Sequence, residues 1–157
     1  MFGHIGFSYV GLIYLLLLLV PNIVWRNTLP PDYDSGEENN ILLLLERVGQ
    51  VGCAVVVLMF GDFNFAPFSA WSVWIILSFA MIGIYELCWF RYFKSAHTNK
   101  DFYRDFYKIP VPMAVFPVAA FVLLGIYGKV IWLIIFAALL GVGHIGIHLA
   151  HAKNAGV

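Results

Sequence analysis

The sequence predicts an all-α membrane protein that crosses the lipid bilayer five times. Of its 157 residues, 62% are hydrophobic and only 11% are charged, whereas a soluble domain has about 45–50% apolar and about 25% charged residues. The apolar residues form five stretches close to the roughly 20 residues that span the hydrocarbon core as a helix. We therefore expect one helical transmembrane domain whose main partner is the lipid bilayer.

The first predicted span covers residues 5–25. It resembles the apolar region of a signal peptide, but no positively charged segment precedes it, and Pro21 to Arg26 follow where a small-residue cleavage site would be needed. We therefore interpret it as a transmembrane helix. The second predicted span covers residues 41–60 and is followed by a short loop, Gly61 to Asn64.

The third predicted span covers residues 70–93. It opens with Trp71 and Trp74 and ends in "YELCWFRYF", so aromatic residues flank it at both ends, as is typical of the two membrane interfaces. The fourth span covers residues 109–127 and carries three prolines in its first half.

The fifth predicted span covers residues 130–151. Only Gly128 and Lys129 separate it from the fourth, so the two helices are expected to form a tight antiparallel hairpin.

Positive charges predict the orientation. With five spans, one side of the membrane collects eight of the nine lysine and arginine residues: Arg26, Arg47, Arg91, Lys94, Lys100, Arg104, Lys108 and Lys153. The other side has only Lys129. Because lysine and arginine accumulate in cytoplasmic loops, we expect the N-terminus outside, the C-terminus in the cytoplasm and a multi-pass location in the inner membrane.

The longer cytoplasmic loop contains "DFYRDFYK", residues 101–108. A helix here would align Phe102 with Phe106 and Tyr103 with Tyr107. This pattern predicts a short helix on the inner leaflet, with an ordinary solvated loop as the alternative.

Three histidines lie on the fifth span, within "GHIGIHLAHA". His144, His148 and His151 are spaced i, i+4 and i+7, which at about 100° per residue places them within an arc of about 60° on one helix face. Ionisable side chains at membrane depth are costly. We therefore treat them as candidates for function.

Two carboxylates are expected at a similar depth. Glu46 lies five residues inside the second span, and Glu86 lies five residues before Arg91 in the third. Together with His144 and His148 they are predicted to converge in the cytoplasmic half of the bundle.

Other polar residues belong to the same region. Asn22 lies at the inner end of the first span, and Gln50 follows Glu46 on one face of the second. His151 is expected to be a polar cap at the water interface. Arg91 is close enough to the surface to extend its charge into water.

Several interpretations of this polar cluster stay open. Two carboxylates and two imidazoles suit a divalent transition metal, and a single histidine could also bind haem, which we rank lower. The same groups suit a proton relay, in a transport system for example, because histidine titrates near neutrality. The alternative is a structural or accessory membrane subunit in which the cluster only holds helices together.

Most enzyme classes find no support in the motifs. The chain has no HExxH zinc signature, no Walker loop and no GxSxG nucleophile motif, so an enzyme is not the expected class and an intramembrane metallohydrolase ranks last. The formal net charge is zero, which argues against a nucleic-acid partner. Small residues such as Ala137 and Gly141 could pack helices within one chain, in a homodimer or against another membrane subunit.

The chain also resembles a group of small multi-pass membrane proteins of bacteria without an assigned function. The resemblance rests on "GHIGFSYVGLIYL", "PNIVW", "LLLLERVGQV", "YELCWFRYFKS", "IPVP", "LLGIYGK" and "GHIGIH". It runs through nearly the whole chain and implies a compact, free-standing inner-membrane protein. It implies no catalytic residue.

Overall fold

The computed structural model describes residues 2–31, 33, 36 and 38–156. Within them the fold is all-α, as predicted, and the only β pairing is two isolated bridges. The helices are α1 (Tyr9–Trp25), α2 (Asn40–Met59), α3 (Val73–Phe93), α4 (Asn99–Phe102), α5 (Pro112–Gly128), α6 (Ile131–Leu140) and α7 (Gly146–Asn154). Two 3-10 turns, η1 (Gly61–Phe63) and η2 (Ala70–Ser72), and one π turn, η3 (Gly141–Ile145), complete them.

Three helical segments are long and apolar enough to cross a membrane. They are Asn40–Met59, Ala70–Phe93 and Ile131–Asn154, the last formed by α6, the π turn and α7 together. α1 and α5 are shorter apolar helices of 17 residues each. Each of the five lies where the sequence predicts a span.

The first helix begins four residues later than the predicted span. The segment before it is extended and pairs with the end of α2: the N–H groups of Gly6 and Ser8 donate to the carbonyl oxygens of Met59 and Leu58, at 2.8 and 3.0 Å. The Ser8 hydroxyl then accepts from the N–H of Gly11 at 2.8 Å. Ser8 therefore caps the helix where pairing with α2 stops.

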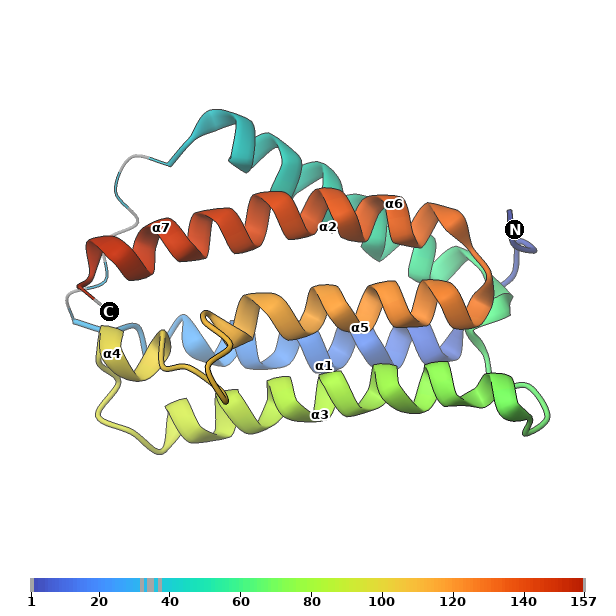
Figure 1. The fold of residues 1–157 in the computed structure, drawn as a ribbon, viewed down its shortest axis with the longest axis horizontal. Helices are drawn as coiled ribbons and strands as arrows, with labels where there is room; N and C mark the ends of the chain where they lie inside the picture. The colour runs from blue at the N-terminus through green and yellow to red at the C-terminus, as the bar shows by residue number, and fades with distance from the viewer. Residues whose placement is uncertain (1, 32, 34–35, 37, 157) are drawn as a thin grey trace.

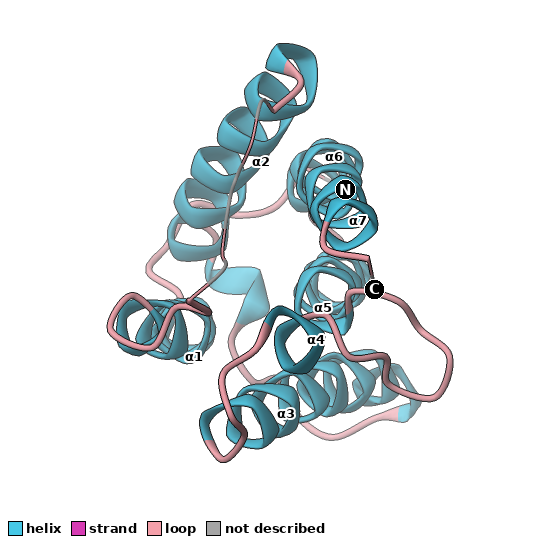
Figure 2. Ribbon diagram, turned by 90° about the vertical axis from the view of Figure 1, so that its left-hand side faces the viewer, coloured by secondary structure: helices cyan, strands magenta, loops and turns pink. Residues whose placement is uncertain are grey.

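The long helices run along one axis of the bundle (Figure 1). We call the end that carries α4 the α4 end, and the end where α5 turns into α6 the hairpin end. That turn is the predicted tight hairpin, and Lys129 ends α5 in the left-handed region with φ of 54°. α3 packs along α5, while α2 packs along α6 and the π turn. The α5–α6 hairpin thus lies between α3 and α2 (Figure 2).

α1 and α2 lie close together only near the hairpin end. There Gly11 of α1 lies directly against the carbonyl group of Val57 in α2, with no room for a side chain. Toward the α4 end α2 leans away from α1 (Figure 2).

A buried polar chain joins three helices in the core. The Tyr14 hydroxyl of α1 donates to the Ser78 hydroxyl of α3 at 2.7 Å, and Ser78 donates to the carbonyl oxygen of Ala120 in α5 at 2.6 Å. Tyr14, Ser78 and Ala120 are all fully buried. The hydroxyls of Tyr14 and Ser78 therefore both have a partner, which is the usual condition for polar groups in a core.

This chain predicts an unequal response to two substitutions. Ser78→Ala leaves the buried Tyr14 hydroxyl without a partner, which costs about 1–3 kcal/mol. Tyr14→Phe removes one hydrogen bond but leaves Ser78 bonded to Ala120, so its cost is expected near the average of about 0.6 kcal/mol found for side-chain hydrogen bonds in membranes. Thermal unfolding in detergent, followed by circular dichroism, is expected to show the larger loss for Ser78→Ala. A larger loss for Tyr14→Phe than for Ser78→Ala would contradict the central place of Ser78 in this series of hydrogen bonds.

The "DFYRDFYK" loop differs from the predicted surface helix. A Thr98–Asp101 capping box starts α4, but the helix ends at Phe102. The Arg91 guanidinium donates to the backbone carbonyl oxygens of Arg104 and Asp105, at 2.6 and 3.1 Å, and so holds the following segment in a non-helical conformation.

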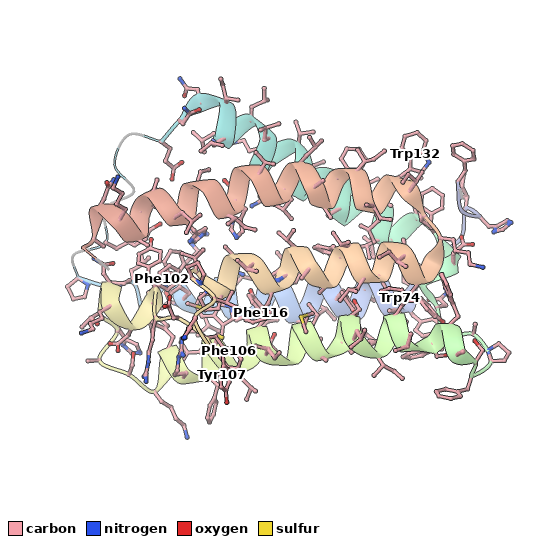
Figure 3. The ribbon with its side chains drawn as sticks, viewed as in Figure 1. Trp74, Phe102, Phe106, Tyr107, Phe116 and Trp132 are labelled. Carbon is pink, nitrogen blue, oxygen red and sulfur yellow. The ribbon has the colours of Figure 1, made fainter. Side chains whose placement is uncertain are left out.

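The four aromatic residues of this loop consequently do not form a stripe. Phe102 and Tyr103 are buried, Phe106 packs edge-on against Phe116 at a centroid distance of 5.6 Å, and Tyr107 points outward (Figure 3). The prediction of aligned aromatic pairs on the inner leaflet was wrong, because the pattern carried no information about Arg91.

Candidate functional site

A cavity of about 590 Å³ extends from the middle of the bundle toward the α4 end. Its walls come from α1, α2, α3, α5 and the α6–α7 helix. Residues of both α1 and α2 line it, and these two helices diverge toward the α4 end (Figure 2). We call this cavity the pocket. His144 and His148 line its wall on the α6–α7 helix, Gln50 lies on α2 and Asn22 on α1.

Two glycines bring α2 against the wall that carries the histidines. Gly49 of α2 lies against the backbone of Leu140, and Gly143 of the π turn lies against the backbone of Glu46. A Cβ atom at Gly143 would come within 2.6 Å of the carbonyl oxygen of Leu42. This approach, typical of small residues at helix contacts in membranes, places the Glu46 side chain beside His144.

Glu46 and His144 form the closest polar contact of the site. The Oε1 atom of Glu46 lies 2.5 Å from Nδ1 of His144, and the Gln50 side-chain amide donates to the same oxygen at 3.3 Å. When a carboxylate accepts from Nδ1–H of an imidazole, the other ring nitrogen becomes the acceptor. Nε2 of His144 is then available to a group in the pocket.

The rings of the three histidines lie next to one another along the α6–α7 helix. The rings of His144 and His148 meet at a centroid distance of 4.4 Å, and those of His148 and His151 at 6.3 Å. His151 is 6% exposed, and its Nε2 lies 3.3 Å from Oε1 of Glu38. The predicted polar cap is thus a buried residue, because the segment before α2 covers it with Glu38 and Tyr33.

His144 lies within the π turn Gly141–Ile145. A π turn inserts one residue into an α-helix, and such insertions are frequent at functional sites. The sequence signal for it was weak: two glycines, Gly141 and Gly143, precede His144 in a run of apolar residues.

Glu86 does not join the other three predicted residues. It is absent from the pocket wall, and its Oε1 atom is buried without a hydrogen bond to any described residue. The preceding residue, Tyr85, lines the pocket instead. Because α3 and α2 pack on opposite sides of the α5–α6 hairpin, equal depth in the membrane does not bring Glu86 near Glu46.

The predicted metal site stays a prediction, with a geometry that does not favour it. Among the described residues, no group of three or more His, Cys, Asp or Glu side chains is arranged to hold a metal ion. Glu46, His144 and His148 instead follow one another in a row.

Asn22 and Arg91 have partners other than the cluster. The Asn22 side-chain amide donates to the Tyr85 hydroxyl at 2.8 Å and to the carbonyl oxygen of Leu18 at 2.7 Å, so it forms a second polar point on the pocket wall. Arg91 holds the loop carbonyls described above. The parts of Tyr85, Tyr33 and Glu38 in this site were not predicted, since a tyrosine in an apolar span and an acidic residue in a loop give no distinctive pattern.

A second carboxylate–imidazole pair lies at the hairpin end. Nδ1 of His4 lies 2.8 Å from Oδ1 of Asp62. Burial would raise the pKa of the Asp62 carboxyl, but its hydrogen bonds to His4 and the charge of His4 outweigh this and hold the pKa below its ordinary value. His4 and His144 both occur in the tetrapeptide GHIG. As expected, His4 is far from the pocket.

Comparisons with known proteins identify no relative: the chain matches no protein-family model, no curated protein and no solved structure. The pocket and its histidine row therefore have to be interpreted from their own geometry.

Proposed function

We propose that the chain is a multi-pass protein of the inner membrane with five spans, its N-terminus outside and its C-terminus in the cytoplasm. Three helices long enough to span and two apolar 17-residue helices beside them support five spans. The charges support the orientation, because Lys153 lies in the last turn of α7 at the α4 end, whereas Lys129 lies at the hairpin end.

Within this protein, Glu46, His144, His148, His151 and Glu38 form a proton relay between the pocket and the cytoplasmic side. The observation that carries the proposal is the order of these groups in one row, with a 2.5 Å contact between Glu46 and His144 at one end and a 3.3 Å approach of His151 to Glu38 at the other.

Each histidine has a defined part in the relay. Glu46 orients the His144 ring and stabilises its charge when Nε2 takes a proton from the pocket, as a carboxylate does for the histidine of a catalytic triad. His148, in ring contact with His144, is the next acceptor. The 6.3 Å between the His148 and His151 ring centroids is longer than a direct hydrogen bond allows, so one bridging water or a ring rotation completes that step.

The relay ends near water. A small cavity of about 130 Å³ lies beside His151 and is also lined by Tyr33, Asn99 and Tyr103. Burial, and then the nearby Tyr33 and Glu38, raise the pKa of the Tyr103 phenol above its ordinary value, so it stays protonated. Toward the hairpin end the core is filled by apolar side chains such as Val57 and Phe63, so the proposal is proton exchange with the pocket and not a channel.

Nuclear magnetic resonance of protein labelled with ¹⁵N at histidine, in lipid nanodiscs without added ligand, tests the relay. In the native chain the ring protons of His144, His148 and His151 are expected to exchange as a coupled set. Glu38→Gln and His151→Asn are expected to slow proton exchange at His144 by about tenfold, equivalent to about 1.4 kcal/mol in the barrier. Glu38→Gln is expected to perturb the structure less than His151→Asn, since the Glu38 side chain is 22% exposed and that of His151 is 6% exposed.

His97→Asn is the matched control. His97 lies in the loop after α3 and contacts Tyr92 and the carbonyl oxygen of Phe93, not the row. It should leave exchange at His144 unchanged. If His144 exchanges at the native rate in both Glu38→Gln and His151→Asn, or if the ring protons of the three histidines exchange independently, the relay is excluded and the row only packs helices.

A further inference from the structure

The pocket has two chemically different parts. Its wall near the middle of the bundle is aliphatic, with Leu15 and Leu19 from α1, Val51 and Ala54 from α2, and Leu140 from α6. Such a surface suits a hydrocarbon tail, as in most binding sites for small amphiphilic molecules.

The part near the α4 end is aromatic. Trp25, Tyr85, Trp89 and Phe102 line it, beside the imidazoles. Flat rings that enclose a cavity favour a flat ring as the ligand, because offset-stacked and edge-on aromatic contacts add to the burial of apolar area.

Polar groups reach this aromatic part from two sides. His144 and His148 lie on the α6–α7 wall, and the Asn22 amide and Tyr85 hydroxyl lie on the facing wall. The described residues of the wall include no lysine or arginine, so nothing there would compensate a buried phosphate or carboxylate. A ligand with neutral oxygen substituents at opposite edges of a ring satisfies both sides.

We propose that the pocket binds a lipid-soluble ring compound of the quinone and quinol class, with its ring against the pocket-facing side of the cluster of Trp25, Trp89 and Phe102 and its isoprenoid tail along the aliphatic wall. One ring oxygen meets Nε2 of His144: a quinol hydroxyl donates to it, and a quinone carbonyl accepts from it once Nε2 is protonated. The other ring oxygen meets the Tyr85 hydroxyl, which can turn to the ligand from the carbonyl oxygen of Leu18 because that oxygen also accepts from Asn22. The inference rests on the proposed relay, since the His144 tautomer set by Glu46 makes Nε2 an acceptor for a quinol hydroxyl. Binding alone is proposed, without electron transfer.

Entry from the membrane is consistent with the packing. α1 touches α2 near Gly11 and Val57 and diverges from it toward the α4 end. Leu19 of α1 and Val51 of α2 are both pocket residues and strongly exposed, with relative exposures of 55% and 65%. A tail can therefore leave the pocket between α1 and α2 into lipid.

Titration with a 1,4-naphthoquinone carrying a short isoprenoid tail, in nanodiscs, tests this ligand class. Bound quinone quenches indole fluorescence, and Trp25 and Trp89 are in the pocket wall, so saturable quenching is expected. Ala54→Phe, which fills the aliphatic part, is expected to weaken the apparent Kd about tenfold or more, about 1.4 kcal/mol. Ala80→Phe, on the exposed face of α3 outside the pocket, is the matched control and should bind like the native chain.

Competition distinguishes the ligand classes. A long-chain alcohol is expected to compete weakly and an anionic fatty acid not at all; equal competition by either would overturn the proposal of a ring compound. Quenching that does not saturate, or that Ala54→Phe leaves unchanged, would overturn binding in the pocket. The histidine experiment uses ligand-free protein, so the proton relay can be confirmed even if quinone does not bind. Failure of the relay and failure of quinone binding are therefore distinguishable.

Discussion

Replacing Gly143 with alanine is expected to destabilise the protein by about 1–3 kcal/mol, the usual cost of inserting a methyl group into a packed core. The new Cβ would meet backbone atoms of α2, among them the carbonyl oxygen of Leu42 at 2.6 Å and Cα of Glu46 at 2.8 Å. Backbone atoms cannot rotate away as a side chain can, so the two helices must move apart.

The same movement would lengthen the contact between Glu46 and His144. Gly143 precedes His144 and lies against the backbone of Glu46, so separation at this point acts directly on their 2.5 Å contact. Gly143→Ala is therefore expected to lower the midpoint of thermal unfolding in detergent and to weaken the coupling of proton exchange at His144.

Gly83→Ala is the matched control. Gly83 is also a glycine within a long helix, but no atom lies within 4 Å of the position that its Cβ would take. Its replacement is expected to be neutral or to stabilise α3 by about 0.5–1 kcal/mol, the preference of helices for alanine over glycine. Equal effects of the two substitutions would mean that the glycine contact between α2 and the π turn does not determine the helix separation.

The positions of the long apolar helices could be predicted from the sequence because they depend on local composition. A run of apolar residues forms a helix in lipid whatever its neighbours are, and the predicted spans agree with the helices to within a few residues. The row of His144, His148 and His151 could be predicted for a similar reason, since helical spacing alone places them on one face.

The partners of those histidines depended on helix packing, which the sequence pattern does not encode. Glu46 and Glu86 were indistinguishable by depth, yet only Glu46 lies on the helix that packs against the π turn. His151 appeared to be at the water interface because its cover, Glu38, comes from a loop distant in the sequence. The hydrogen bonds from Arg91 to the backbone of the loop after α4 were not predicted either, because a side chain that binds backbone carbonyl oxygens needs no particular residue type as its partner.

Phe102→Ala is expected to have the second large effect on stability. Phe102 is 4% exposed and stacks on Trp25 at a centroid distance of 5.0 Å, with edge-on contacts to Tyr92 at 5.5 Å and Tyr103 at 4.9 Å. It joins the short α4 to the ends of α1 and α3 and forms part of the pocket wall.

The position of Phe102 determines the size of the effect. Between helices within lipid, apolar contacts gain little from the hydrophobic effect because the lipid tails are equally apolar. α4 lies at the end of the bundle, between α3 and α5 in the sequence. When the protein unfolds there, Phe102 becomes exposed to water and not to lipid. The truncation is therefore expected to cost about 3 kcal/mol, the lower limit for Phe→Ala in a water-soluble core.

Tyr107→Ala is the comparison that makes this prediction specific to the aromatic cluster. Tyr107 belongs to the same loop but is 89% exposed and points away from the bundle (Figure 3), so its loss is expected to change stability by less than about 0.5 kcal/mol. Thermal unfolding of both variants in the same detergent measures the difference. A loss for Phe102→Ala no greater than that for Tyr107→Ala would show that the contacts of Phe102 do not hold α4 against the pocket, and the proposed ring site would then lose one of its three aromatic residues.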